Sequence, residues 1–185
     1  MNDPHENATW VYNYDHGGNI TSKVRYAYTT GTVGTAVETI PYAYGDANWK
    51  DKLTAYNGTA ITHDAIGNPL NDGSWTYEWA VGRQLKKMSR DGQSLTFKYD
   101  HNGMRIQKVL EHSWYPETTN YTYHGSMLTH MEVAYTDFDE AGHVDKLHFF
   151  YDAQSRPAKA RFNGTIYTYV HNLQGDIVGI LDSAG

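Results

Sequence analysis

The sequence contains no cysteine. This absence excludes disulfide scaffolds, thiol nucleophiles, iron–sulfur clusters and cysteine-based zinc sites, but it does not exclude export. No apolar run approaches the roughly 18 residues that a membrane-spanning helix requires. The first seven residues are neither basic nor hydrophobic enough for a signal peptide. We therefore expect no membrane span and, if the protein is exported, a targeting segment upstream of this sequence.

Charge is scarce as well, because only 19% of the 185 residues are charged and the net charge is −6. Such a chain lacks the bulk basic surface that neutralises phosphates, so we expect no nucleic-acid partner. The Gly-x-Ser-x-Gly nucleophile pattern and the glycine-rich phosphate-binding patterns are absent too. From these absences we expect no catalytic residues, no cofactor and no functional metal.

Tyrosine and glycine, by contrast, are abundant, with 16 and 17 residues. Aromatic residues favour strands, and glycine above its usual share of about 7% favours tight turns. The composition therefore predicts an all-β protein. The length suits one ordinary domain or two small ones, and no linker or low-complexity stretch interrupts the sequence. We expect residues 1–185 to form a single region.

A short pattern recurs along the chain: an aromatic residue, Asp, two variable residues and then Gly. An Asp side chain can accept hydrogen bonds from backbone N–H groups further along a turn, and Gly can adopt a positive φ without steric cost. The pattern therefore predicts a turn, with the aromatic packed on the neighbouring strand. The residues assigned to these turns are Tyr14, Asp15, Gly18, His63, Asp64, Gly67, Tyr99, Asp100, Gly103, Tyr151, Asp152, Asn172 and Gly175.

Polar and apolar residues alternate before several of these turns, as in 94–99 and 165–170. Alternation with period two is typical of half-buried strands, so each turn is predicted to join two antiparallel strands. Asn-Gly and Asp-Gly pairs in other loops are further hairpin signals. Only residues 47–56 carry large apolar residues at helical spacing, which leaves a short helix there as an open alternative.

The repeated residues resemble the YD-repeat, or Rhs, family, and residues 169–182 are the most specific part of the likeness. The family includes bacterial Rhs and wall-associated polymorphic toxins, toxin-complex shells and teneurins. The resemblance implies a strip of β-hairpins that forms a partial section of a spiralling hollow shell. It also implies an exported or cell-surface bacterial protein, with flanking repeats and a C-terminal effector, often a toxin, in the same chain. At this length we expect a fragment, and no self-cleaving motif is present to carry over.

On this basis the sequence predicts a non-enzymatic structural module of an Rhs-type shell. The alternative is a carbohydrate- or cell-surface-binding module, in which Trp75 and Trp114 stack on sugar rings; packing against neighbouring strands is the simpler role for both. The unpaired edge strands of an isolated strip also predict self-association.

Three further groups of residues are more simply explained without a ligand. Residues 137–142 begin like a calcium loop, but the loop lacks two of the expected oxygen ligands, so a turn is predicted. Four nearby histidines lack metalloprotease spacing, so we expect solvated or aromatic-packed side chains: His124, His130, His143 and His148. The one local basic patch is predicted to be a solvated strand end: Arg83, Lys86, Lys87 and Arg90.

Overall fold

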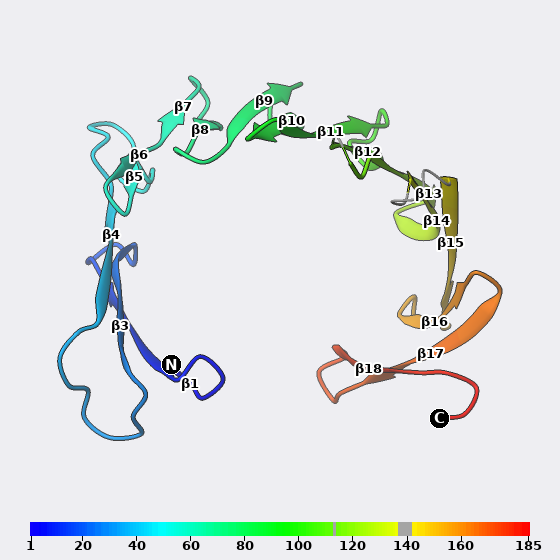
Figure 1. Ribbon diagram of the computed structural model, residues 1–185. Coiled ribbons are helices and arrows are strands. Elements are labelled where there is room, and N and C mark those ends of the chain that lie inside the picture. The colour runs from blue at the N-terminus through cyan, green and yellow to red at the C-terminus, as the bar shows by residue number, and fades with distance from the viewer. Residues whose placement is uncertain (113, 137–141) are drawn as a thin grey trace. The chain divides into compact units, whose positions relative to one another are not determined.

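The computed structural model describes residues 1–112, 114–136 and 142–185. In that part of the chain 18 strands and no helix are present, which confirms the all-β prediction (Figure 1). A search of the same residues for a helix that could span a membrane finds none. The strands form two antiparallel sheets, of 6 and 12 strands, in which each strand pairs with its neighbours in the sequence.

The chain divides into two compact units, residues 1–77 and 78–185. The first unit holds the six-stranded sheet and the beginning of the second sheet. Its strands are β1 (Asn2–Asp3), β2 (Ala8–Tyr14), β3 (Ile20–Ala27), β4 (Glu38–Ala43), β5 (Ala55–Tyr56), β6 (Thr59–Ala60), β7 (Thr62–His63) and β8 (Pro69–Asn71). β9 (Thr76–Ala80) crosses the boundary between the units.

The second unit is a meander of longer hairpins. Its strands are β10 (Gln84–Arg90), β11 (Gln93–Tyr99), β12 (Arg105–Glu111), β13 (Glu117–His124), β14 (Met127–Thr136), β15 (Gly142–Tyr151), β16 (Pro157–Phe162), β17 (Thr165–His171) and β18 (Ile177–Leu181). The alternating segments 94–99 and 165–170 lie in β11 and β17, as their period-two pattern predicts. β18 is an edge strand of the sheet.

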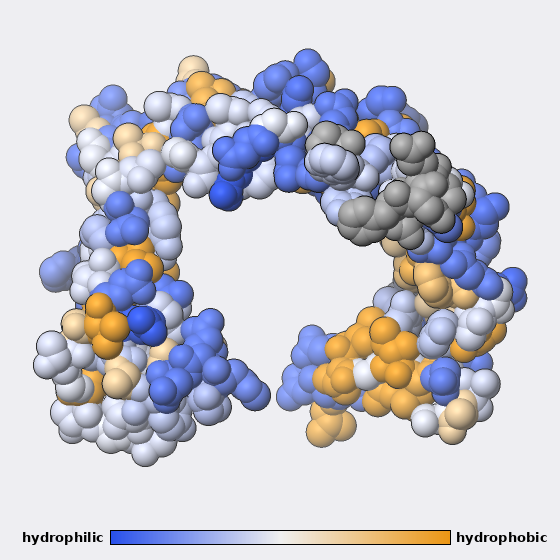
Figure 2. Space-filling view, in the orientation of Figure 1, coloured by the Kyte–Doolittle hydropathy of each residue, from blue (hydrophilic) through white to orange (hydrophobic). Residues whose placement is uncertain are grey.

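Each unit is a single layer of sheet with almost no enclosed core. Among the described residues, the buried apolar side chains are only Ala8, Val24 and Ala160. Strands in contact are those adjacent in the sequence, so no second layer covers either face in the described part of the chain. The fold must therefore draw its stability from cross-strand pairs and turns rather than from a buried centre. Figure 2 shows the exposed apolar surface over β18.

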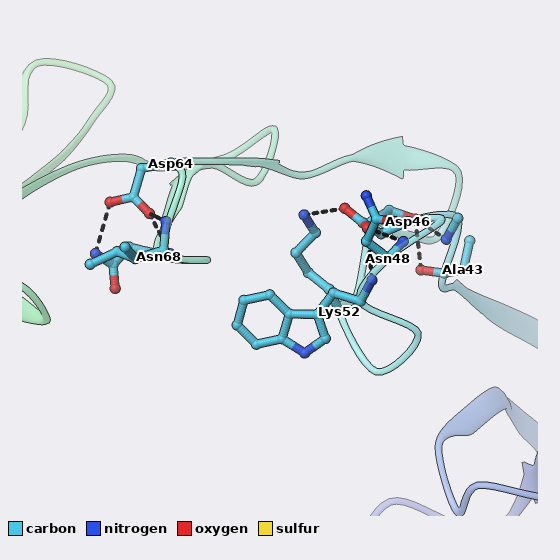
Figure 3. Close-up of polar contacts among 10 residues, drawn as sticks. Ala43, Asp46, Asn48, Lys52, Asp64 and Asn68 are labelled. Carbon is cyan, nitrogen blue, oxygen red and sulfur yellow. Dashed lines mark hydrogen bonds and ion pairs between the residues drawn. The ribbon is translucent and has the colours of Figure 1, made fainter.

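The open alternative of a helix at residues 47–56 is wrong. These residues form bends and a turn before β5. The Asp46 carboxylate accepts hydrogen bonds from the N–H groups of Asn48 and Trp49, both at 2.9 Å, and forms an ion pair with Lys52 (Figure 3). A side chain that captures backbone N–H groups in this way favours a turn, which helical spacing alone does not reveal.

Candidate functional site

The repeated turns share one hydrogen-bond arrangement around the Asp or Asn side chain. In the turn after β11, Oδ1 of Asp100 accepts hydrogen bonds from the N–H groups of Asn102 and Met104, both at 2.9 Å. The same pair of bonds, to the second and fourth residues onward, recurs in the other four copies. Their acceptors are Asp15, Asp64, Asp152 and Asn172.

The backbone of each turn closes in the same way. The Asp100 N–H donates to the carbonyl of Met104 at 2.9 Å, and the Gly103 N–H donates back to the carbonyl of Asp100 at 3.1 Å. Gly103 has a φ of +81°, in the left-handed region that glycine tolerates best. Ser155 adopts the same region at the equivalent position, with a φ of +62°, where a Cβ makes the conformation costly. The remaining glycines at this position are Gly18, Gly67 and Gly175, and all have positive φ.

In the turns of Asp15, Asp64 and Asp152, the second carboxylate oxygen forms an additional contact with the residue that ends the turn. Oδ2 of Asp64 accepts from the Asn68 side-chain amide at 2.8 Å (Figure 3). Oδ2 of Asp152 accepts from Nε of Arg156, also at 2.8 Å. The side chain therefore ties the beginning of the turn to the following strand.

These donors lower the pKa of three turn carboxyls, those of Asp15, Asp64 and Asp152. The backbone N–H of Arg156 is the largest influence on the pKa of Asp152, and it outweighs desolvation, which acts in the opposite direction. At Asp64 desolvation is the largest influence and raises the pKa, but the N–H and side-chain donors together lower it overall. The carboxylates are thus held in their charged form as hydrogen-bond acceptors.

The aromatic residue of the pattern occupies more than one environment. The hydroxyls of Tyr99 and Tyr151 donate to backbone carbonyls of the preceding strand, at Leu85 (2.9 Å) and Leu128 (2.7 Å). Tyr14 is instead 60% exposed. His63 is half-buried in β7. The stabilisation of the turns by these aromatic residues stays a prediction, and substitution can test it.

The two tryptophans with a predicted glycan role lie in different units. Trp114 is 71% exposed, and its backbone N–H donates to Nδ1 of His112 at 3.1 Å. Trp75 is half-buried, and its backbone N–H donates to Oδ1 of Asp72 at 2.7 Å. Sugar stacking by either residue stays a prediction. Close by, the hydroxyl of Tyr77 donates to Oδ2 of Asp72 at 2.7 Å, and desolvation together with this carboxylate raises the Tyr77 pKa to about 12.

Part of the basic patch expected near β10 is engaged in ion pairs. Lys86 lies 3.6 Å from Glu78, and Arg90 lies 3.0 Å from Asp91. The calcium loop considered at 137–142 lies outside the described residues, apart from Gly142. Within the described ranges no group of three or more histidine or acidic residues is arranged to hold a metal.

The histidines reveal a contact that the sequence analysis missed. The rings of His130 and His148 face each other across β14 and β15, with centroids 4.3 Å apart. Nε2 of His130 lies 3.5 Å from Oε1 of Glu132, and Nζ of Lys146 lies 3.4 Å from the same oxygen. Alternation along β14 places His130 and Glu132 on the same face of the strand. Only the strand register shows that His148 and Lys146 of β15 lie opposite them.

Comparison with known proteins relates the chain to nucleases, although no protein-family model matches it. It is 33% identical over 190 residues to the tRNA3(Ser)-specific nuclease WapA of Bacillus spizizenii, and 32% identical over 189 residues to the tRNA nuclease WapA of Bacillus subtilis. Both alignments cover 100% of this chain and 7% of the relative. The tRNA(Glu)-specific nuclease WapA of Bacillus subtilis subsp. natto is 32% identical over 141 residues, or 75% of this chain and 6% of the relative.

These relatives contradict three expectations. The chain was expected to belong to a non-enzymatic structural or carbohydrate-binding module, to have no enzymatic activity and to have no nucleic-acid partner, whereas its relatives are named as nucleases of tRNA. A charge count over the whole chain excludes a generally basic protein, but it does not address local basic surfaces or the chemistry of a much longer protein. The chain is a homologue of one section of the WapA nucleases and spans about 7% of their length.

Proposed function

We propose that this chain is a hairpin-built section of a nuclease toxin that acts on tRNA. The observation that carries the proposal is the similarity to WapA nucleases along the whole chain, at 33% and 32% identity. Relatedness over every hairpin favours a shared protein architecture over a shared short motif. The activity is proposed for the whole protein, since the chain spans about 7% of these relatives.

We further propose that the five turns are repeats of the YD, or Rhs, type. The support is their common geometry: each has the same two side-chain bonds and a positive φ at the same position. The copy at Asn172 keeps these bonds with an amide in place of a carboxylate. A polymorphic toxin built from such repeats would lie at the cell surface or be secreted, and the WapA relatives favour that location.

Incubation of the longest natural chain that contains these 185 residues with total tRNA tests the proposed activity. The expected result is discrete cleavage of one or a few tRNA species on a denaturing gel. A heat-denatured sample is the control for contaminating ribonuclease. Intact tRNA after incubation with folded protein would overturn the proposal. Detection of the protein only in the cytoplasmic fraction of its native cells would overturn the location.

A further inference from the structure

One face of β14, β15 and β16 presents basic and aromatic side chains to solvent. From Val144 to the end of β15 exposure alternates, with Lys146, His148 and Phe150 more exposed than the residues between them. Successive side chains of a strand point to opposite faces, so these three share one face at intervals of about 6.6–6.8 Å. Phe150 is 40% exposed, which is high for a large apolar side chain in the middle of a sheet.

The strand register adds side chains from both neighbouring strands to this face. His130 of β14 is opposite His148, and His148 is in turn opposite Arg161 of β16. In the next row Phe150 is opposite Lys159. The Arg161 guanidinium carbon lies 5.6 Å from the centre of the Phe150 ring. We name this set the β15 face: His130, Lys146, His148, Phe150, Lys159 and Arg161.

The β15 face is positively charged although the chain as a whole is negative. It carries the cations Lys146, Lys159 and Arg161. Glu132 of β14 is opposite Lys146 and adds a carboxylate, which forms an ion pair with Lys146. On the strands that flank the face, Thr122 of β13 is opposite His130 and Ile166 of β17 is opposite Arg161, and both are uncharged. A cationic patch on a chain of net charge −6 complements a polyanion locally without making the whole protein basic.

The combination of side chains matches the chemistry that holds unpaired bases. Single-stranded RNA is bound by aromatic rings, histidine rings and arginine planes on which bases stack, together with cations that contact the backbone. Arg161 can bind a phosphate through two parallel N–H groups. A duplex keeps its bases stacked inside the helix, where exposed rings on a sheet cannot reach them.

We propose that the β15 face binds single-stranded segments of RNA, such as the unpaired loops or end of a tRNA. The inference rests on the proposed function for its substrate class. It goes beyond that function by placing an RNA contact on the hairpins of this section.

Fluorescence anisotropy of the 185-residue chain with a labelled 12-nucleotide single-stranded RNA tests the inference. Lys159→Gln with Arg161→Gln should weaken binding at least tenfold and reduce the salt-dependence slope by about 1.4, since each lost phosphate contact removes about 0.7. Phe150→Ala should weaken binding about tenfold through lost stacking. The matched control is Lys50→Gln with Lys86→Gln, which removes the same charge at exposed positions outside the face and should change the affinity less than twofold.

Three outcomes would overturn the inference. They are no RNA binding by the unaltered chain, an equal loss of RNA affinity in the control variant, or equal affinity for RNA and polyglutamate. The last would show that binding depends on negative charge alone. Circular dichroism and urea unfolding of each variant exclude loss of folding as the cause. The tRNA cleavage assay separates the two proposals. Cleavage together with unaltered RNA binding by the Lys159 and Arg161 variant overturns only the β15 face, whereas absence of cleavage overturns the nuclease.

Discussion

Replacement of Asp100 by Ala tests the idea that the repeated side chain holds each turn together. Oδ1 of Asp100 accepts the N–H groups of Asn102 and Met104 at 2.9 Å, and alanine can accept neither. A hydrogen bond to a charged acceptor contributes about 1.5–3 kcal/mol when it is well shielded. Asp100 and Met104 are only half-buried, so water replaces part of each bond. We expect a loss of about 2 kcal/mol in the free energy of opening this turn, comparable to the loss of a helix N-cap.

Asp100→Asn is the matched control, because Asn172 already makes the equivalent pair of bonds in the last copy, at 3.0 and 2.9 Å. The amide keeps the acceptor and loses only the charge. The loss should therefore stay below about 1 kcal/mol, the value of a neutral hydrogen bond. A substantial difference between Ala and Asn would show that the acceptor, rather than the size of the side chain, stabilises the turn.

Amide hydrogen exchange at Asn102 and Met104 is the sharpest measurement, because it reports the opening of this hairpin alone. A loss of about 2 kcal/mol corresponds to roughly 30-fold faster exchange. Urea unfolding of the whole chain provides the second readout. Exchange within threefold of the unaltered chain in Asp100→Ala, or equal acceleration in Asp100→Asn, would refute the reasoning.

Three further predictions follow from the turns and their tyrosines. Ser155→Gly should stabilise the protein by about 1 kcal/mol in urea unfolding, since Ser155 has a φ of +62°; Gly103→Ser should have the opposite effect, and equal stability of both variants would contradict this. Because the pKa of Asp152 is lowered in the folded chain, its contribution to stability is present above its unfolded pKa of about 4 and is lost as the pH falls through the lower folded value. Asp152→Asn should therefore flatten the acid side of a stability profile, and an unchanged profile would count against the lowered pKa. The pKa of Tyr77 is raised to about 12, so its hydrogen bond to Asp72 stabilises the fold below about pH 10 and is lost as the pH rises through the folded value. Burial also raises the pKa of Tyr42, Tyr44, Tyr123 and Tyr169, so the ultraviolet titration is read near pH 12, where a tyrosine signal should be lost in Tyr77→Phe; its persistence there would assign it to another residue.

The turns could be predicted from the sequence because their bonds are local. Every side-chain contact of Asp100 in its turn lies within four residues, so residue type and spacing suffice to specify it. The segment 47–56 shows the limit of the same reasoning. Its apolar spacing permits a helix, but the Asp46 carboxylate captures two N–H groups and directs the chain into a turn. Apolar spacing favoured a helix there and the Asp46 side chain favoured a turn, and the spacing alone could not show which of the two would prevail.

The β15 face could not be predicted, because it depends on pairing between strands. His130 and His148 are 18 residues apart in the sequence, and a shift of one residue in register would send one of them to the other face of the sheet. The pairing is further offset by bulges, such as the one between Phe150 and Tyr151. The net charge of −6 also gave no sign of a locally cationic surface, because a sum over the whole chain does not show where the charges lie.

By itself the sequence determined the all-β class and the strip of hairpins, because alternation and turn chemistry act over a few neighbouring residues. The tertiary structure alone decided which side chains from different strands share a face, and that almost none of them would be buried. Both depend on strand register and on the absence of a covering layer across the described residues, and these are properties of the paired backbone that no short stretch of sequence contains.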